Sequence, residues 1–234
     1  MGRTYTKFAD PETQKLLTLL VDRETSPEDY KTVMFKLGVK LGNSILNSIE
    51  NRQSYVYLAC TVEDADFLAK GILSSLETEV SQLAFACFWN QRFSPFEVED
   101  LKIAPIIKKY QEPVNNHVVQ YLIVVKSIIS GACVVRTNLS NLIQKIEPEN
   151  IFIAAPVIYE TAEEKLRKEF DKEIYDKFQF FYFAKDDERN EQGIVLPGIG
   201  GNVYERLGFE GQDDKNRYVP EIVKSRRSKL VQKI

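Results

Sequence analysis

The stretch Gln120–Ile143, QYLIVVKSIISGACVVRTNLSNLI, indicates how the chain folds. Its apolar, β-branched run Tyr121–Val125 is too short for a helix and is typical of a strand buried on both faces. A turn of small residues, Ser130–Cys133, follows, and apolar residues then recur from Val134 to Ile143 at the spacing of an amphipathic helix. Strand, small-residue loop and helix form a unit whose backbone N–H groups and helix N-terminus can face a phosphate.

The flanking segments repeat this alternation. We expect strands at Ser54–Cys60, Leu83–Trp89, Ile151–Ala155 and Phe178–Phe183, and helices at Ala65–Leu76 and Thr161–Phe170. Asn90–Glu112 lacks a clear period and is expected to be an irregular excursion or a hairpin. Strands that alternate with helices imply right-handed crossovers. The predicted fold class is therefore α/β, with a central, mostly parallel sheet and helices on both faces.

Two helices are expected near the N-terminus, after a loose lead-in at residues 1–9. Asp10 and Ser26 can each cap a helix, and each precedes a proline, which suits the first helical position. The second of these helices is predicted to run to about Ile49.

Composition sets limits on function. The chain has 234 residues, of which 44% are hydrophobic, and this is enough for a full core. A formal charge of −3 argues against wholesale nucleic-acid binding. The sequence shows no charged-then-apolar leader and no apolar run of about 18 residues, so we expect a cytoplasmic protein without membrane contact. No metal site is expected, because the Cys and His residues are scattered; these are Cys60, Cys87, Cys133 and His117.

A motif near the end of the chain resembles that of a known family. Asn190-Glu191-Gln192-Gly193, followed by Pro197-Gly198-Ile199-Gly200, is similar to the closing Asn-Glu-x-Gly-Tyr-Ile-x-Pro-Gly-Leu-Gly-Asp run of uracil phosphoribosyltransferases. The resemblance covers roughly residues 10–209. It implies a phosphoribosyltransferase-like domain at 1–209 and a homodimer. It assigns a pyrimidine loop to Val195, Leu196, Gly198, Ile199, Gly200 and Gly201, and a phosphate-loop remnant to Ser130, Gly131, Ala132 and Cys133.

Several positions depart from the family pattern. The acidic residue of the family's Asp-Pro-x-x-Ala-Thr-Gly-Gly-Ser loop is replaced by Val125, and its second glycine by Ala132. The family's pyrophosphate-binding Arg-Ala-Gly-Leu-Gly segment is matched by Thr61–Asp66, which holds three carboxylates and no arginine. In the next strand the family carries an arginine after an aromatic residue, and this chain has Trp89 at that position. Losing one electrostatic donor lowers turnover about 10²–10³-fold, so these changes together predict a pseudoenzyme.

Two functions follow from this comparison. The first is a catalytically degenerate uracil phosphoribosyltransferase-like protein that acts as a binding or assembly subunit, senses a pyrimidine base or nucleotide, and has neither catalytic residues nor a cofactor. The alternative is an active uracil phosphoribosyltransferase of pyrimidine salvage. It would convert uracil and phosphoribosyl pyrophosphate to UMP and pyrophosphate with Mg²⁺, using a rebuilt pyrophosphate site.

Individual side chains also have simpler interpretations. For Glu63, Asp64 and Asp66 we favour a solvated helix start over a metal site. We favour a small buried residue over a nucleophile for Cys133, and a loop residue over a general base for His117. An aromatic cluster is expected to form a core or a dimer contact more readily than to stack a base; it comprises Phe88, Trp89, Phe93 and Phe96.

The last part of the chain, residues 210–234, changes character. Phe209–Pro220 is expected to be a linker, and Glu221–Ile234 a short basic amphipathic helix. Residues 210–234 carry a net charge of +3, which leaves −6 on the rest. Such a tail could dock on its own acidic domain or hold an anionic partner, either a protein or a nucleic acid. We expect the partner contact, and we expect the fold to survive deletion of Glu221–Ile234.

Overall fold

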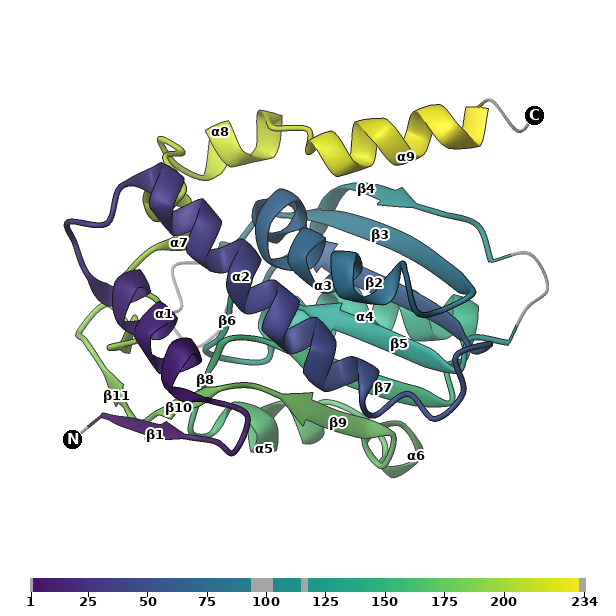
Figure 1. Ribbon diagram of the computed structural model, residues 1–234, viewed down its shortest axis with the longest axis horizontal. Helices are drawn as coiled ribbons and strands as arrows, with labels where there is room; N and C mark the ends of the chain where they lie inside the picture. The colour runs from purple at the N-terminus through teal and green to yellow at the C-terminus, as the bar shows by residue number, and fades with distance from the viewer. Residues whose placement is uncertain (1, 94–102, 115–117, 232–234) are drawn as a thin grey trace.

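The computed structural model describes residues 2–93, 103–114 and 118–231. Its main sheet has the strand order β4-β3-β2-β5-β7-β9, and neighbouring strands are parallel except for the antiparallel pair β3 and β4 (Figure 1). The strands are β2 (Tyr55–Thr61), β3 (Gln82–Asn90), β4 (Ile106–Gln111), β5 (Tyr121–Val125), β7 (Asn150–Ala154) and β9 (Phe178–Phe181). The predicted α/β class is confirmed. The antiparallel pairing of β3 with β4 agrees with a hairpin at Asn90–Glu112, although residues 94–102 of that segment lie outside the described residues.

Strand β5 lies inside the sheet with helices on both sides. Leu122 and Val124 face the helix α4, whereas Tyr121, Ile123 and Val125 face the N-terminal helices. The first face is covered by α4 (Cys133–Ile146), α5 (Ala162–Arg167) and α6 (Lys172–Tyr175). The second is covered by α1 (Pro11–Val21), α2 (Pro27–Leu46), the π-helical turn η2 (Ala65–Ala69) and α3 (Lys70–Leu76). Burial on both faces explains the uninterrupted apolar run of this strand.

The two N-terminal helices begin where their capping residues predict. The Asp10 side chain accepts a hydrogen bond from the Thr13 N–H at 2.7 Å, and the Ser26 hydroxyl accepts one from the Asp29 N–H at 3.1 Å. Helix α2 ends at Leu46, earlier than expected. It packs closely on α3, because a Cβ at Gly71 of α3 would lie 2.2 Å from the Phe35 carbonyl oxygen of α2.

A second sheet carries the N-terminal segment. Its order is β1-β10-β8-β6, formed by β1 (Arg3–Tyr5), β10 (Ala184–Asp186), β8 (Val157–Tyr159) and β6 (Ile128–Ile129). Strand β1 pairs antiparallel with β10, so the loose lead-in expected at residues 1–9 is wrong for Arg3–Tyr5. The Arg3 guanidinium donates two hydrogen bonds of 2.8 Å to the Asp186 carboxylate, which explains the order at this end. The hairpin β11 (Glu188–Arg189) with β12 (Val195–Leu196) carries the closing motif.

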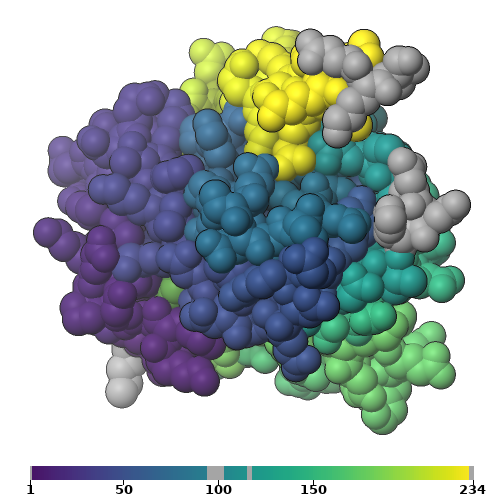
Figure 2. Space-filling model, turned by 45° about the vertical axis from the view of Figure 1, so that its right-hand side comes forward, coloured from purple at the N-terminus to yellow at the C-terminus, as the bar shows by residue number. Residues whose placement is uncertain are grey.

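The tail segment, residues 210–231, is folded onto the body. After α7 (Val203–Arg206) come α8 (Gln212–Arg217) and α9 (Glu221–Val231), and Figure 2 shows the yellow atoms of α9 lying against the blue-green surface of the chain. The Asp66 carboxylate accepts hydrogen bonds from the first N–H groups of α9, and Arg226 pairs with Glu112 at 3.0 Å. These contacts dock α9 on the acidic body of the same chain. Phe209–Pro220, where a linker was expected, contains α8, whose Lys215 is buried. An additional partner contact stays a prediction for the exposed residues Lys224, Arg227 and Lys229.

The expected aromatic dimer contact loses its basis. Phe88 and Trp89 are buried within the chain itself, with exposed fractions of 0% and 2%. Phe93 is exposed, and Phe96 lies outside the described residues. The surface inferred from Phe88 and Trp89 is therefore wrong, while the homodimer itself stays a prediction. Among the described residues, none of the helices combines the length and the apolar character that crossing a bilayer requires.

Candidate ligand-binding cleft

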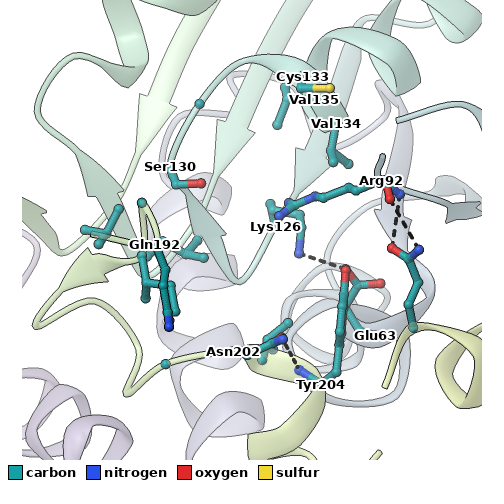
Figure 3. Close-up of a pocket in the computed structure, with 18 of the residues that line it drawn as sticks. Glu63, Arg92, Lys126, Ser130, Cys133, Val134, Val135, Gln192, Asn202 and Tyr204 are labelled. Carbon is teal, nitrogen blue, oxygen red and sulfur yellow. Dashed lines mark hydrogen bonds and ion pairs between the residues drawn. The ribbon is translucent and has the colours of Figure 1, made fainter. Parts of the chain in front are cut away.

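A cleft of about 520 Å³ opens at the carboxyl ends of β2, β3 and β5. Its walls come from the turn after β2, the residues that follow β3, the loop between β5 and α4, the β11–β12 hairpin and the region of α7 and α8 (Figure 3). Ligands in parallel α/β sheets bind where the loops at the carboxyl ends of the strands diverge. The cleft lies in this position.

The phosphate-loop remnant, Ser130–Cys133, lies at the N-terminus of α4. Ser130, Gly131 and Cys133 line the cleft, whereas Ala132 is buried behind them. Among the described residues, none provides a side-chain cap for α4, whose N-cap residue is Ala132. A Cβ placed on Gly131 would meet no atom within 4 Å, so this loop borders open space. Burial raises the pKa of the Cys133 thiol, which disfavours the nucleophilic thiolate.

The pyrimidine loop is only partly in the cleft. Of its assigned residues, Val195 and Gly201 line the cleft, joined by Gln192, Gly193 and Ile194 of the same hairpin. Leu196 is exposed and Ile199 is buried. Gly198 and Gly200 have positive φ, and a Cβ at Gly200 would lie 2.1 Å from the Leu20 carbonyl oxygen. These two glycines therefore shape the loop without lining the cleft.

Three charged side chains, Glu63, Asp64 and Lys126, form what we call the ion-pair floor. The Lys126 Nζ lies 3.1 Å from Glu63 Oε1 and 3.0 Å from Asp64 Oδ2, and Figure 3 shows the pair with Glu63 beneath the cleft. The Asp64 carboxylate also accepts hydrogen bonds from the Thr61 hydroxyl and from the Ser127 N–H. All three charged side chains are at most 4% exposed.

Burial and neighbouring charges shift the pKa values of the three groups in the ion-pair floor in different ways. Burial would raise the pKa of Glu63, but Lys126 and Lys215 lower it to about 2. Burial raises the pKa of Asp64 despite the same lysine. Burial would lower the pKa of Lys126, yet the two carboxylates outweigh it and raise the pKa. Lys126 is therefore a protonated cation whose charge is neutralised inside the protein.

This arrangement corrects the solvated helix start predicted for Glu63, Asp64 and Asp66. The first two residues are buried with Lys126, and Asp66 caps α9. Sequence reasoning missed Lys126, although a signal existed. Glu63 follows the end of β2 by two residues and Lys126 follows β5 by one, and these strands are parallel neighbours. Residues in such positions meet at the carboxyl edge of a sheet.

Two arginines that sequence reasoning also missed add positive charge to the cleft. The Arg189 guanidinium stacks 3.9 Å above the Tyr159 ring and donates a hydrogen bond to the Ser130 carbonyl oxygen. Arg92 follows β3 and points into the cleft over Lys126 (Figure 3). Among the described residues that line the cleft, three carry positive charge and only Glu63 carries negative charge. The lining therefore favours an anionic ligand.

Comparisons with known proteins show the fold. No family model and no curated protein sequence matches the chain. The AQ2163 protein from Aquifex aeolicus has a similar structure, with a TM-score of 0.65 at 14% identity over 86% of this chain and 96% of that one. An adenine phosphoribosyltransferase from Trypanosoma brucei, solved with AMP, pyrophosphate and ribose-5-phosphate, gives a TM-score of 0.48 at 11% identity over 97% and 95%. A xanthine-guanine-hypoxanthine phosphoribosyltransferase from Helicobacter pylori gives a TM-score of 0.38 at 13% identity over 68% of this chain and 85% of that one.

Proposed function

We propose that the protein is a phosphoribosyltransferase-like protein that binds a phosphate-bearing pyrimidine ligand in the cleft and does not transfer a phosphoribosyl group. The closing motif at Asn190–Gly200 supports the family assignment. The observation that carries the proposal is the ion-pair floor. It occupies the turn after β2, where the resemblance assigns the pyrophosphate clamp.

Phosphoribosyl transfer expels pyrophosphate, so it depends on cations held against the leaving group. In this chain the turn after β2 presents Glu63 and Asp64 in place of such cations. Lys126 is nearby but is already paired with both carboxylates at 3.0–3.1 Å. A polyanion placed here would meet one neutralised cation and the negative charge of two carboxylates, which disfavours its binding.

The other half of the cleft keeps the features that suit a single phosphate. The N-terminus of α4 has no side-chain cap from the described residues, and the space beside Gly131 is open. A helix N-terminus with its N–H groups favours negative charge. The volume of about 520 Å³ lies within the range of small-molecule sites, roughly 300–1,000 Å³. A nucleoside monophosphate fits these features.

One assay separates this function from the active alternative. Labelled uracil, phosphoribosyl pyrophosphate and Mg²⁺ are incubated with the protein, and UMP is measured. We expect no UMP above the protein-free background, together with calorimetric binding of added UMP. UMP formation would overturn the pseudoenzyme proposal, and the absence of UMP binding would overturn the ligand assignment.

The active alternative has one observation in its favour. Arg92 and Arg189 are cations of the cleft that the family motif does not predict, and they could form a rebuilt clamp. If UMP is formed, Arg92→Ala decides whether this clamp is responsible. Loss of transfer in a variant that keeps the wild-type melting temperature would identify Arg92 as part of the clamp.

A further inference from the structure

One carboxylate oxygen of the ion-pair floor is left without a partner. Glu63 Oε1 lies 3.1 Å from Lys126 Nζ, and a dashed line in Figure 3 marks this pair. Glu63 Oε2 is buried and has no hydrogen-bond partner within the described part of the chain. A buried carboxylate oxygen normally accepts at least one hydrogen bond, because leaving it desolvated and unpaired costs free energy. Glu63 Oε2 is therefore an acceptor whose donor these residues do not supply.

The location of this oxygen distinguishes it from other unpaired atoms. Three further buried side-chain atoms lack a partner among the described residues; they are Thr161 Oγ1, Arg206 Nε and Asn216 Oδ1. None of their residues lines the cleft, whereas Glu63 does, with a side chain that is 4% exposed. The neighbouring Asp64 accepts hydrogen bonds on both of its oxygens and does not line the cleft. A ligand in the cleft can thus supply the donor that Glu63 lacks.

The charges around Glu63 limit the kind of group that it can bind. Although burial opposes the shift, Lys126 and Lys215 lower the pKa of Glu63 to about 2, so the ionised carboxylate can only accept hydrogen bonds. The carboxylate would repel an anionic group. A cationic group would meet the like charges of Lys126 and Arg92, which also line the cleft. A neutral donor, either a hydroxyl or an amino group, avoids both repulsions.

We propose that Glu63 Oε2 accepts a hydrogen bond from a neutral hydroxyl or amino group of the ligand, and that this contact makes Glu63 a specificity-determining residue. The inference rests on the proposed function only in taking a nucleoside monophosphate as the ligand, and it assigns no position to the phosphate. Such compounds offer both kinds of donor, the hydroxyls of the sugar and, in cytosine, the amino group of the base. The floor keeps its structural role, because Oε1 remains paired with Lys126. A ligand without the donor leaves Oε2 unpaired, and sites built for a hydrogen bond discriminate against such ligands.

Calorimetric titration of the full-length protein with three nucleotides, UMP, CMP and 2′,3′-dideoxy-UMP, tests this. The dideoxy compound lacks both ring hydroxyls of UMP, and CMP carries an amino group where UMP has a carbonyl oxygen. We expect one of two preferences, UMP over dideoxy-UMP or CMP over UMP, to reach roughly 10-fold, the value of one hydrogen bond to a charged group. The first preference assigns the donor to the sugar, and the second assigns it to the base. If neither preference appears, Oε2 accepts nothing from the ligand and the inference is overturned.

Two variants of the floor locate the effect. In Glu63→Gln the amide oxygen stays on Lys126, because an ammonium group can only donate. The amide NH₂ then takes the place of Oε2 and presents a donor to the donor of the ligand, so the preference should be abolished. Asp64→Asn is the matched control, since it removes a carboxylate from the same lysine but not from the lining of the cleft. It should keep the full preference, and the melting temperatures of both variants are measured in parallel.

The remaining outcomes separate this inference from the proposed function. A preference that persists in Glu63→Gln assigns the donor to another acceptor and overturns the inference. Loss of the preference in both variants shows that it follows the integrity of the floor, which also overturns the role of Oε2. Equal binding of the three nucleotides contradicts the inference alone. UMP formation in the transfer assay contradicts the proposed function alone, because these preferences do not depend on turnover, and absence of binding by all three nucleotides contradicts both.

Discussion

The ion-pair floor and the phosphate-loop remnant follow neighbouring parallel strands, yet they differ in what they can bind. The floor contains three ionisable groups, and each lies within 3.1 Å of another. The remnant contains small, uncharged side chains and borders open space. The floor has more charged groups than the remnant, but its charges are less available to a ligand. Binding of an anion depends on donors that are left without a partner, and the number of charged residues does not measure this.

Burial explains why the floor cannot rearrange for a ligand. Separating Lys126 from its two carboxylates would leave unpaired charges at sites that are at most 4% exposed. Charges in such sites interact strongly with each other and are poorly solvated. The floor is thus a structural element in a position where the family resemblance implies a ligand-binding one.

The largest expected effect comes from breaking the floor. Lys126→Met leaves Glu63 and Asp64 buried without the cation that both of them contact, and it should lower the free energy of unfolding by about 3–5 kcal/mol, measured by urea denaturation. The matched control adds Glu63→Gln and Asp64→Asn. Because this triple variant removes all three charges, it should recover most of the loss. A Lys126→Met protein within 1 kcal/mol of wild type would show that the floor is not a buried ion pair.

Adding a negative charge to the phosphate-loop remnant should weaken its binding of a phosphate. Gly131→Asp places a carboxylate at the N-terminus of α4, where it competes with a phosphate for the N–H groups. We expect UMP affinity to fall about 10-fold or more, with the unfolding free energy within about 0.5 kcal/mol of wild type. Gly131→Ala, which meets no neighbour within 4 Å, should bind UMP as wild type does. Unchanged UMP binding in Gly131→Asp would place the phosphate elsewhere.

The floor should also be visible in the pH dependence of stability. Folding lowers the pKa of Glu63 from 4.5 to about 2. Its contribution is therefore present above pH 4.5 and is lost as the pH falls toward 2. Glu63→Gln should flatten this part of the stability curve, by at most about 1.4 kcal/mol per pH unit. The raised pKa of Asp64 acts in the opposite sense in both proteins. Parallel curves for the two proteins would contradict the ion pair with Lys126.

The smallest effect is expected where an ion pair is exposed. Lys168 and Glu164 lie 2.5 Å apart on α5 and its C-terminal end, a closer approach than in the floor, but their side chains are 73% and 67% exposed. Lys168→Ala should have the urea midpoint of wild type within experimental error, because water screens the pair. A clear loss of stability would mean that distance, and not burial, sets the value of these ion pairs.

Local sequence patterns predicted most of the fold. The apolar run at Tyr121–Val125 matches β5 residue for residue, and the caps at Asp10 and Ser26 begin α1 and α2. These features depend on residues close together in the chain. The order at β1 depends on Arg3 meeting Asp186, and a three-residue polar strand has no local signal that distinguishes it from a loose end.

The site was harder to predict, because it depends on pairings between distant segments. Glu63, Asp64 and Asp66 form one acidic run in the sequence, but they face different partners, Lys126 for the first two and the start of α9 for the third. The tail and the body carry opposite charges, which is compatible with docking of the tail on its own body or on a partner. Charge alone does not decide between these two arrangements, whereas the specific contact of Arg226 with Glu112 shows docking on the body.

The pairing of Arg3 with Asp186 has a consequence for synthesis. The two residues are 183 positions apart, and the Asp186 carboxylate also accepts a hydrogen bond from the Gly198 N–H at 2.8 Å. During translation, β1 therefore has no edge to join until β10 has left the ribosome, whereas β2, β3 and β5 can already associate. Contacts between such distant segments form slowly because a very long loop must close. The hairpin wall of the cleft follows β10, so in a nascent chain it joins the body after β2, β3 and β5 have associated, and α8, whose Gln212 also lines the cleft, follows it.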